Sequence, residues 1–214
     1  MDNVIHWYPG HMAKTRRMIE DNLKLIDVVV EIIDARIPFS GRNKDFDDIL
    51  KNKPRLLVLN KADLADSSAT DEWVSYYAKN GIRVIPISCT TGAGINKVFS
   101  EARRLTQDRI DRDKEKGRTR TLKIMMAGIP NVGKSSLINR LIGKASTKTG
   151  DKAGVTKGKQ WVRIRGDVEL LDIPGMLPTK MEDQERAKLI AYTGAVKDEI
   201  MNTELLAYDL CARL

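Results

Sequence analysis

Short apolar runs alternate with amphipathic stretches along most of this chain. The runs at 27–35, 55–60, 82–88 and 121–128 are rich in β-branched and aliphatic residues. Such continuous runs predict strands that are covered on both faces of a sheet. Between and around them, apolar residues recur at helical spacing. These stretches predict helices at 12–25, 70–80, 95–107 and 134–143.

Two further apolar runs, 160–165 and 168–173, are separated by Gly166 and Asp167. A turn of this type between two strands predicts a hairpin. Strands that alternate with helices favour an α/β fold with a mostly parallel sheet, here with one antiparallel edge. Residues 184–214 have a helical pattern without a stop signal, and we expect them to begin a C-terminal helical domain after an α/β domain at 1–183.

Composition narrows the class of protein. The chain has 214 residues, of which 42% are hydrophobic and 31% charged, as is usual for a globular domain. Cys89 and Cys211 are too few for a disulfide framework, and no apolar run reaches the roughly 20 residues of a membrane span. The N-terminus lacks the apolar core of a signal peptide. We therefore expect a cytoplasmic protein with no membrane partner.

The formal net charge is +8, which suggests a polyanionic partner. Lysines and arginines outnumber acidic residues in the stretch 103–123. A solvated helix face with a charged linker is the alternative interpretation of that stretch.

The stretch 128–136, GIPNVGKSS, has the pattern Gly-x-x-x-x-Gly-Lys-Ser between a predicted strand and a predicted helix. In that context the glycines let the backbone wrap phosphates, and successive N–H groups point at them from the start of a helix. Lys134 is expected to reach the β- and γ-phosphates, and the Ser135 hydroxyl to ligate Mg²⁺. The predicted phosphate-binding residues are Pro130, Asn131, Val132, Gly133, Lys134, Ser135 and Ser136.

A γ-phosphate site also needs a carboxylate near Mg²⁺ and a glycine N–H. The pattern Asp-x-x-Gly occurs at Asp151–Gly154 and at Asp172–Gly175. We favour Asp172 as the Mg²⁺ carboxylate and Gly175 as the N–H donor, because Asp172 ends an apolar strand whereas Asp151 lies in a polar stretch.

That polar stretch also holds the candidates for a threonine that closes on Mg²⁺ when triphosphate is bound. Thr156, in AGVTKG, is the preferred candidate, with Thr147 and Thr149 as rivals. Such segments often become ordered only when the γ-phosphate is present.

Guanine recognition is predicted earlier in the chain, where the run 55–60 ends in Asn60-Lys61-x-Asp63. The two oxygens of Asp63 match the N1–H and amino group of guanine, and adenine offers no such pair of donors. Asn60 can bond the base edge, and the stem of Lys61 can lie along the ring. The backbone of Ser88 and Cys89 could meet the guanine O6, although a plain turn explains that stretch equally well.

These motifs together resemble the translation-factor-related GTPases, but the base motifs precede the phosphate loop. This is the order of circularly permuted GTPases. Residues 6–17, 34–43, 59–64, 128–141 and 153–162 further resemble the ribosome biogenesis GTPase A family. The resemblance implies a Ras-like P-loop GTPase fold with circularly permuted motif order, in which residues 1–183 include an N-terminal extension. It also implies a GTP/GDP-binding factor that matures the large ribosomal subunit precursor, contacts its rRNA and is stimulated there to hydrolyse GTP.

The resemblance also bears on catalysis. Met176 occupies the position at which Ras-like enzymes have a water-orienting glutamine, so the intrinsic rate should be low. Asn131 resembles the asparagine of potassium-activated GTPases, which implies K⁺ as an activator beside Mg²⁺. The family suggests His11 as a water-positioning group, although a surface or rRNA-stacking role is the alternative. The expected catalytic set is thus His11, Lys134, Thr156 and Gly175.

Two other functions remain open at this stage. The protein could be an rRNA-binding scaffold whose GTP site senses nucleotide without needed turnover, or an ATP-using P-loop kinase. Asn60 and Asp63 argue against the kinase, because they form a guanine-type pocket. We expect a monomer.

Overall fold

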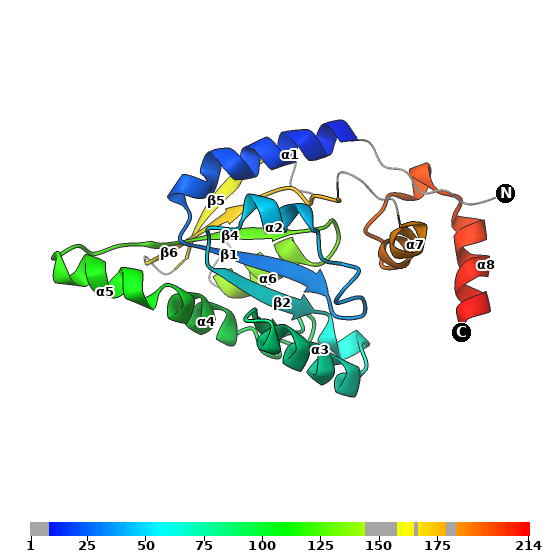
Figure 1. The fold of residues 1–214 in the computed structure, drawn as a ribbon, viewed down its shortest axis with the longest axis horizontal. Coiled ribbons are helices and arrows are strands. Elements are labelled where there is room, and N and C mark those ends of the chain that lie inside the picture. The colour runs from blue at the N-terminus through cyan, green and yellow to red at the C-terminus, as the bar shows by residue number, and fades with distance from the viewer. Residues whose placement is uncertain (1–8, 144–157, 165–166, 179–182) are drawn as a thin grey trace.

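The computed structural model describes residues 9–143, 158–164, 167–178 and 183–214 (Figure 1). Within these residues six strands form one sheet in the order β3-β2-β1-β4-β6-β5. All neighbouring strands pair in parallel except β5 and β6, which are antiparallel. The predicted α/β fold with a hairpin edge is therefore confirmed. The strands are β1 (Val28–Asp34), β2 (Arg55–Asn60), β3 (Arg83–Pro86), β4 (Leu122–Gly128), β5 (Gln160–Ile164) and β6 (Val168–Asp172).

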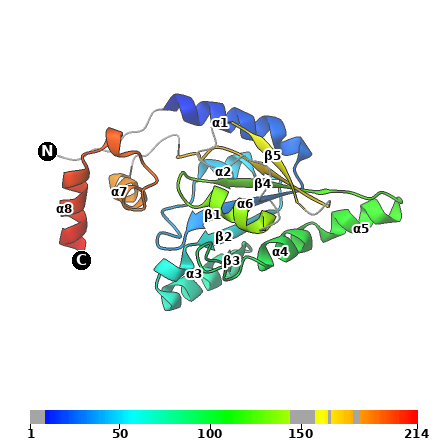
Figure 2. The same cartoon turned by 180° about the vertical axis from the view of Figure 1, so that it is seen from behind.

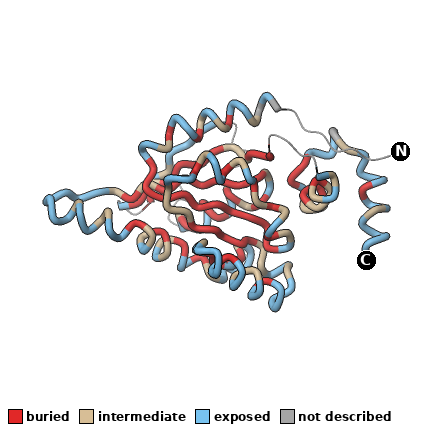
Figure 3. Tube along the Cα trace, in the orientation of Figure 1, coloured by how far each residue is buried: buried red, intermediate tan, exposed pale blue. Residues whose placement is uncertain are grey.

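Helices cover both faces of the sheet, so the strands form the buried middle layer (Figure 3). Alternate residues of β1 enter different apolar clusters: Val30 packs in the cluster that includes α4 and α6, and Val29 in the cluster that includes α1 and α2. This two-sided burial explains why the strands appear in the sequence as continuous apolar runs. The helices are α1 (Pro9–Asn22), α2 (Asp45–Ile49), α3 (Ser67–Lys79), α4 (Lys97–Leu105), α5 (Gln107–Glu115) and α6 (Lys134–Ile142).

Short 3-10 turns follow two of these elements, at Leu23–Leu25 (η1) after α1 and at Ala62–Leu64 (η2) after β2. Helix α3 begins earlier than its apolar spacing indicates. The Asp66 side chain accepts from the Ala69 N–H at 2.8 Å and caps the helix, so Thr70, the first residue of the predicted range, lies inside it. Helix α2 has only five residues and is not apparent in the apolar pattern.

The charged stretch after α4 forms a separate helix, α5, which has no buried residue. It extends the molecule at one end, and α7 (Gln184–Tyr192) and α8 (Thr203–Arg213) lie at the other end (Figures 1 and 2). A 3-10 turn, η4 (Asp198–Ile200), joins α7 to α8. The helical pattern after residue 184 is thus confirmed. The division into domains at 183/184 stays a prediction, and Ala187 and Ile190 of α7 are buried in the same apolar cluster as β1.

Candidate nucleotide site

The predicted site residues follow the carboxyl ends of neighbouring parallel strands. In such sheets ligands bind beyond these ends. Strand β2 ends at Asn60, β4 ends at Gly128, and both strands pair with β1. On the other side of β4, strand β6 ends at Asp172. The base motif and the phosphate loop therefore open on one edge of the sheet although they are far apart in sequence.

Asn60 joins the two halves of the site directly. Its Nδ2 donates to the Val132 carbonyl in the phosphate loop at 2.7 Å, and its Oδ1 accepts from the Cys89 N–H at 3.1 Å. The side chain is 1% exposed, so both bonds are shielded from water. Gly133 is required at this junction: its φ is +95°, and an added Cβ would lie 2.3 Å from the Asn60 amide nitrogen. Three predicted segments thus meet at one amide group.

Lys134 begins α6 and is nearly buried, with 7% of its surface exposed. Its ammonium donates to the carbonyls of Ile129 at 2.8 Å and Gly128 at 3.3 Å, so it lies inside the phosphate loop. Burial lowers the pKa of Lys134 to about 8, and the nearby carboxylate of Asp172 opposes this shift. A polyanionic ligand at this point would supply the negative charge that a buried ammonium favours.

Gly175 brings the segment after β6 against the phosphate loop. A Cβ at Gly175 would lie 2.6 Å from the backbone nitrogen of Pro130, so only glycine fits there. The next residue, Met176, donates its N–H to the Gly128 carbonyl at 3.1 Å, and its side chain is buried in the apolar core. Its carbonyl accepts from Asn43 Nδ2 at 2.9 Å. Asn43, buried and in the predicted family stretch 34–43, had not been identified from sequence as part of the site.

The guanine side of the site contains an ion pair that the sequence pattern did not reveal. Lys61 has a left-handed backbone, with φ of 62°, and its ammonium lies 3.0 Å from the Asp34 carboxylate. Arg36 binds the same carboxylate through two nitrogens, at 2.9 and 2.7 Å. Burial opposes ionisation of Asp34, yet the bonds from Arg36 and Lys61 prevail and lower its pKa. The carboxylate therefore fixes the direction of the Lys61 stem.

The other predicted guanine-binding residues lie near Asn60 and Lys61. They are Asp63, Ser88 and Cys89. Asp63 is exposed, and its charge acts on the Cys89 thiol. Burial is the main cause that raises the pKa of this thiol to about 11. The Ser88 hydroxyl accepts from the Thr91 N–H at 3.0 Å, which shapes the turn. Arg140 of α6 donates to the Cys89 carbonyl at 2.8 Å and so ties this turn to the phosphate half.

The phosphate loop also contacts the C-terminal helices. Asn131 has φ of 58°, and its Nδ2 donates to the Gly194 carbonyl, just after α7, at 2.6 Å. Arg186 of α7 donates to the Ser40 carbonyl at 3.0 Å. Arg186 of α7 therefore contacts the 34–43 stretch, which contains Asn43, and Gly194 just after the helix contacts the phosphate loop.

Some predicted residues cannot be placed with their side chains. Thr156 and its rivals Thr147 and Thr149, as well as Asp151 and Gly154, lie outside the described residues. His11 has a described backbone in α1, but its side chain lies outside the described part. The sulfur of its neighbour Met12 is 3.2 Å from the Leu177 nitrogen, which places this turn of α1 near the segment after Gly175.

A metal could be held by few protein groups. The described residues contain no group of three His, Cys, Asp or Glu side chains suited to a metal. Ser135 at the start of α6 and Asp172, whose charge reaches Lys134, are hard oxygen donors at the same edge. Mg²⁺ at nucleotide sites uses one or two such donors together with phosphate oxygens and water, so these residues fit it.

Among the described residues, no helix has the length and apolarity needed to cross a membrane.

Comparison with known proteins gives consistent matches. A sequence model described as "50S ribosome-binding GTPase" matches residues 123–207. The chain is 49% identical to ribosome biogenesis GTPase A of Bacillus licheniformis, across 95% of this chain and 72% of that protein. It is 35% identical to ribosome biogenesis GTPase A of Thermotoga maritima, across 97% of this chain and 73% of that protein.

A mitochondrial relative and a solved structure agree with these matches. Mitochondrial ribosome-associated GTPase 1 of Mus musculus is 38% identical, across 96% of this chain and 65% of that protein. Among solved structures, GNP-bound YlqF from T. maritima superposes with a TM-score of 0.66 at 30% identity, covering 94% of this chain and 75% of that chain.

Proposed function

The chain belongs to the ribosome biogenesis GTPase A family, and we propose that it hydrolyses GTP while acting in late maturation of the large ribosomal subunit. It is a GTPase with a circularly permuted P-loop fold. The observation that carries the site assignment is the pair of bonds from Asn60 to Val132 and Cys89. These bonds hold the base motif and the phosphate loop next to each other, which supports the proposal that one nucleotide contacts both.

The phosphate half holds the triphosphate. The N–H groups of residues 131–136 surround the phosphates at the start of α6, where the helix dipole favours anions. The Lys134 ammonium moves from the loop carbonyls to the β- and γ-phosphates. Gly175 contributes its N–H to the γ-phosphate. Ser135, Asp172 and Thr156 would hold Mg²⁺, which would neutralise charge on the phosphates when bound.

The base half selects guanine. Asp63 accepts from the N1–H and amino group, Asn60 supports the base edge, and the stem of Lys61 covers the ring. The backbone of Ser88 and Cys89 faces the O6. The ion pair between Asp34 and Lys61 supports this role, because it holds a flexible stem in one direction before the base arrives.

Hydrolysis needs help from groups other than Met176, since that side chain is buried in the apolar core and carries no polar atom for a water molecule. We assign K⁺ activation to Asn131. Its Nδ2 donates a hydrogen bond to the Gly194 carbonyl, and the amide oxygen is an atom of the type that ligates K⁺. His11 positions the attacking water when the ribosomal particle is bound, and the contact between Met12 and Leu177 supports this by placing α1 near the γ-phosphate segment.

The partner is the precursor of the large subunit with its rRNA, and the protein acts as a cytoplasmic monomer. The decisive experiment measures GTP hydrolysis with and without large ribosomal subunits, in K⁺ and in Na⁺. We expect strong stimulation by subunits in K⁺ and slower turnover in Na⁺. If subunits bind without raising turnover, the protein is instead an rRNA-binding scaffold that senses nucleotide.

A further inference from the structure

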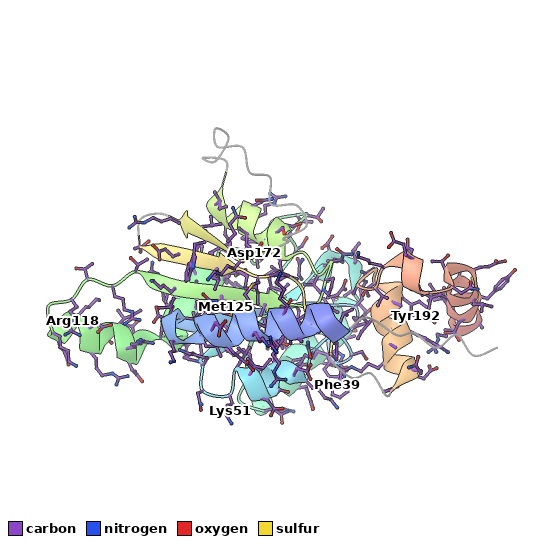
Figure 4. All side chains as sticks on the ribbon, turned by 90° about the horizontal axis from the view of Figure 1, so that it is seen from above. Phe39, Lys51, Arg118, Met125, Asp172 and Tyr192 are labelled. Atoms are coloured by element: carbon purple, nitrogen blue, oxygen red, sulfur yellow. The ribbon has the colours of Figure 1, made fainter. Side chains whose placement is uncertain are left out.

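The end of the molecule that carries α5 is rich in charged side chains, and cationic residues outnumber acidic ones between residues 109 and 120. We define the basic end as the cationic residues of α5 and of the stretch that leads to β4: Arg109, Arg112, Lys114, Lys116, Arg118 and Arg120. Five of them, Arg112, Lys114, Lys116, Arg118 and Arg120, are exposed. Arg118 lies at the opposite end of the long axis from Tyr192 of α7 (Figure 4).

A buried carboxylate organises part of this end. Asp27, directly before β1, is 3% exposed, and its Oδ1 lies 3.0 Å from Arg109 and 2.8 Å from Arg120. Its second oxygen accepts from the Lys123 N–H at 2.9 Å. Arg120 also lies 3.4 Å from Asp113, so two carboxylates hold the two guanidinium groups in place, and the excess positive charge of this end comes from its other cationic residues. A solvated linker would not require this arrangement.

The surface at the basic end is hollowed around Arg120. A hollow of about 470 Å³ is lined by Arg103, Arg109, Lys114, Arg118 and Arg120, with the acidic groups Asp27, Asp113 and Asp167. Two neighbouring hollows, of about 370 and 400 Å³, also include Arg120. Burial and the nearby Arg109 lower the pKa of Lys53, which shows that positive charges crowd this end.

The basic end lies away from the nucleotide. Asp27 precedes β1, Leu122 begins β4 and Asp167 precedes β6, so these residues mark the amino ends of parallel strands. The nucleotide site uses the carboxyl ends of the same strands. The basic end is thus on the opposite edge of the sheet, and a partner bound there leaves the nucleotide pocket open.

We propose that the basic end is a binding surface for the phosphate backbone of double-stranded RNA. A fixed guanidinium group can donate two hydrogen bonds at once to the oxygens of a phosphate. Exposed lysines add positive charge, and neither contact depends on the base sequence of the RNA. Helix α5 has nine residues and spans about 13 Å at 1.5 Å per residue, enough to follow several phosphates. The choice of RNA among polyanions rests on the proposed function, which places the protein on a ribosomal precursor.

The test uses charge reversal at residues that no described ion pair engages. In the variant Lys116→Glu/Arg118→Glu, both changes lie on exposed positions of the basic end. The matched control is Lys79→Glu/Lys97→Glu, which alters the net charge equally at exposed positions of α3 and α4 outside the basic end. GDP affinity and thermal unfolding of both variants report on the fold and on the nucleotide site.

Binding of a fluorescent RNA duplex of about 20 base pairs is measured by anisotropy without nucleotide or ribosomes, from about 50 to 200 mM KCl. We expect the basic-end variant to lose at least about tenfold in affinity and its log–log salt slope to fall by about 2, one unit for each lost phosphate contact. The control should change less than about threefold, with GDP binding intact in both.

Equal losses in the two variants would overturn the proposal, because net charge alone would then explain binding. No loss in either would overturn it as well. Polyglutamate or anionic phospholipid vesicles that bind as tightly as the duplex would show that RNA is not the preferred partner. Failure of ribosomal subunits to stimulate GTP hydrolysis would refute the proposed function while the duplex measurement still decides the role of the basic end.

Discussion

Replacing Asn60 by alanine should break the junction between the base half and the phosphate half. The change removes the donor to the Val132 carbonyl and the acceptor for the Cys89 N–H, both at a residue that is 1% exposed. Each buried backbone group left without a partner costs about 1–3 kcal/mol. The free energy of unfolding should therefore fall by about 2–5 kcal/mol, with partial relief if water enters the gap.

Two measurements check this value. For a domain of this size a loss of 1 kcal/mol lowers the melting temperature by about 2–4 °C, so the melting temperature should fall by roughly 5–15 °C. Affinities for GDP and GTP should fall together by at least about tenfold, because the junction positions base and phosphates relative to each other rather than the γ-phosphate alone.

The control is Asn96→Ala, an exposed asparagine that makes no side-chain cap bond at the start of α4. It should stay within about 0.5 kcal/mol of the unaltered protein. An Asn60→Ala protein that matches this control in both stability and GDP affinity would refute the idea that one amide unites the two halves.

Four further outcomes are expected. Gly133→Ala should abolish nucleotide binding, because its Cβ would approach the Asn60 nitrogen to 2.3 Å at a φ of +95°; titration with a fluorescent GDP analogue checks this. The pKa of Lys134 in the folded protein, about 8, is below its ordinary 10.5, so from about pH 8 to 10.5 the unfolded chain holds a proton that the folded protein has lost. Stability of the nucleotide-free protein relative to Lys134→Met should therefore rise across this window, and a flat difference in denaturant unfolding would contradict the burial of the ammonium. Iodoacetamide at pH 8 should modify exposed Cys211 far faster than Cys89, whose pKa is raised to about 11, as peptide mass spectrometry would show; equal rates would mean that the Cys89 corner opens freely. Asp63→Asn should shift preference from guanine toward xanthine nucleotides, and an unchanged preference in competition binding would remove Asp63 from the base site.

The parts of the site that were predictable are those whose chemistry depends on neighbours in sequence. A glycine-rich loop between a strand and a helix predicts that Lys134 and Ser135 belong to a phosphate site, because the same few residues make the turn and start the helix. Continuous apolar runs announced the strands, since both faces of the sheet are covered. The permuted order of the motifs is visible directly in the sequence, because Asn60 and Asp63 precede Lys134 and Ser135 along the chain.

Contacts that join distant segments through single side chains were not predictable. No local pattern shows that Asp34 holds Lys61, that Asn43 holds the backbone after Gly175, or that Asn131 bonds to Gly194. Helix α5 is a similar case. Its charges alone are compatible with a linker, and only the burial of Asp27 between Arg109 and Arg120 shows that part of the stretch is fixed.

The most direct test of the account is a crystal structure of this protein with GDP and Mg²⁺. We expect the guanine edge within hydrogen-bond distance of Asp63 and the β-phosphate beside the Lys134 ammonium, with Asn60 still joining the two sides. A nucleotide bound to the phosphate loop with its base turned away from Asp63 would contradict the account.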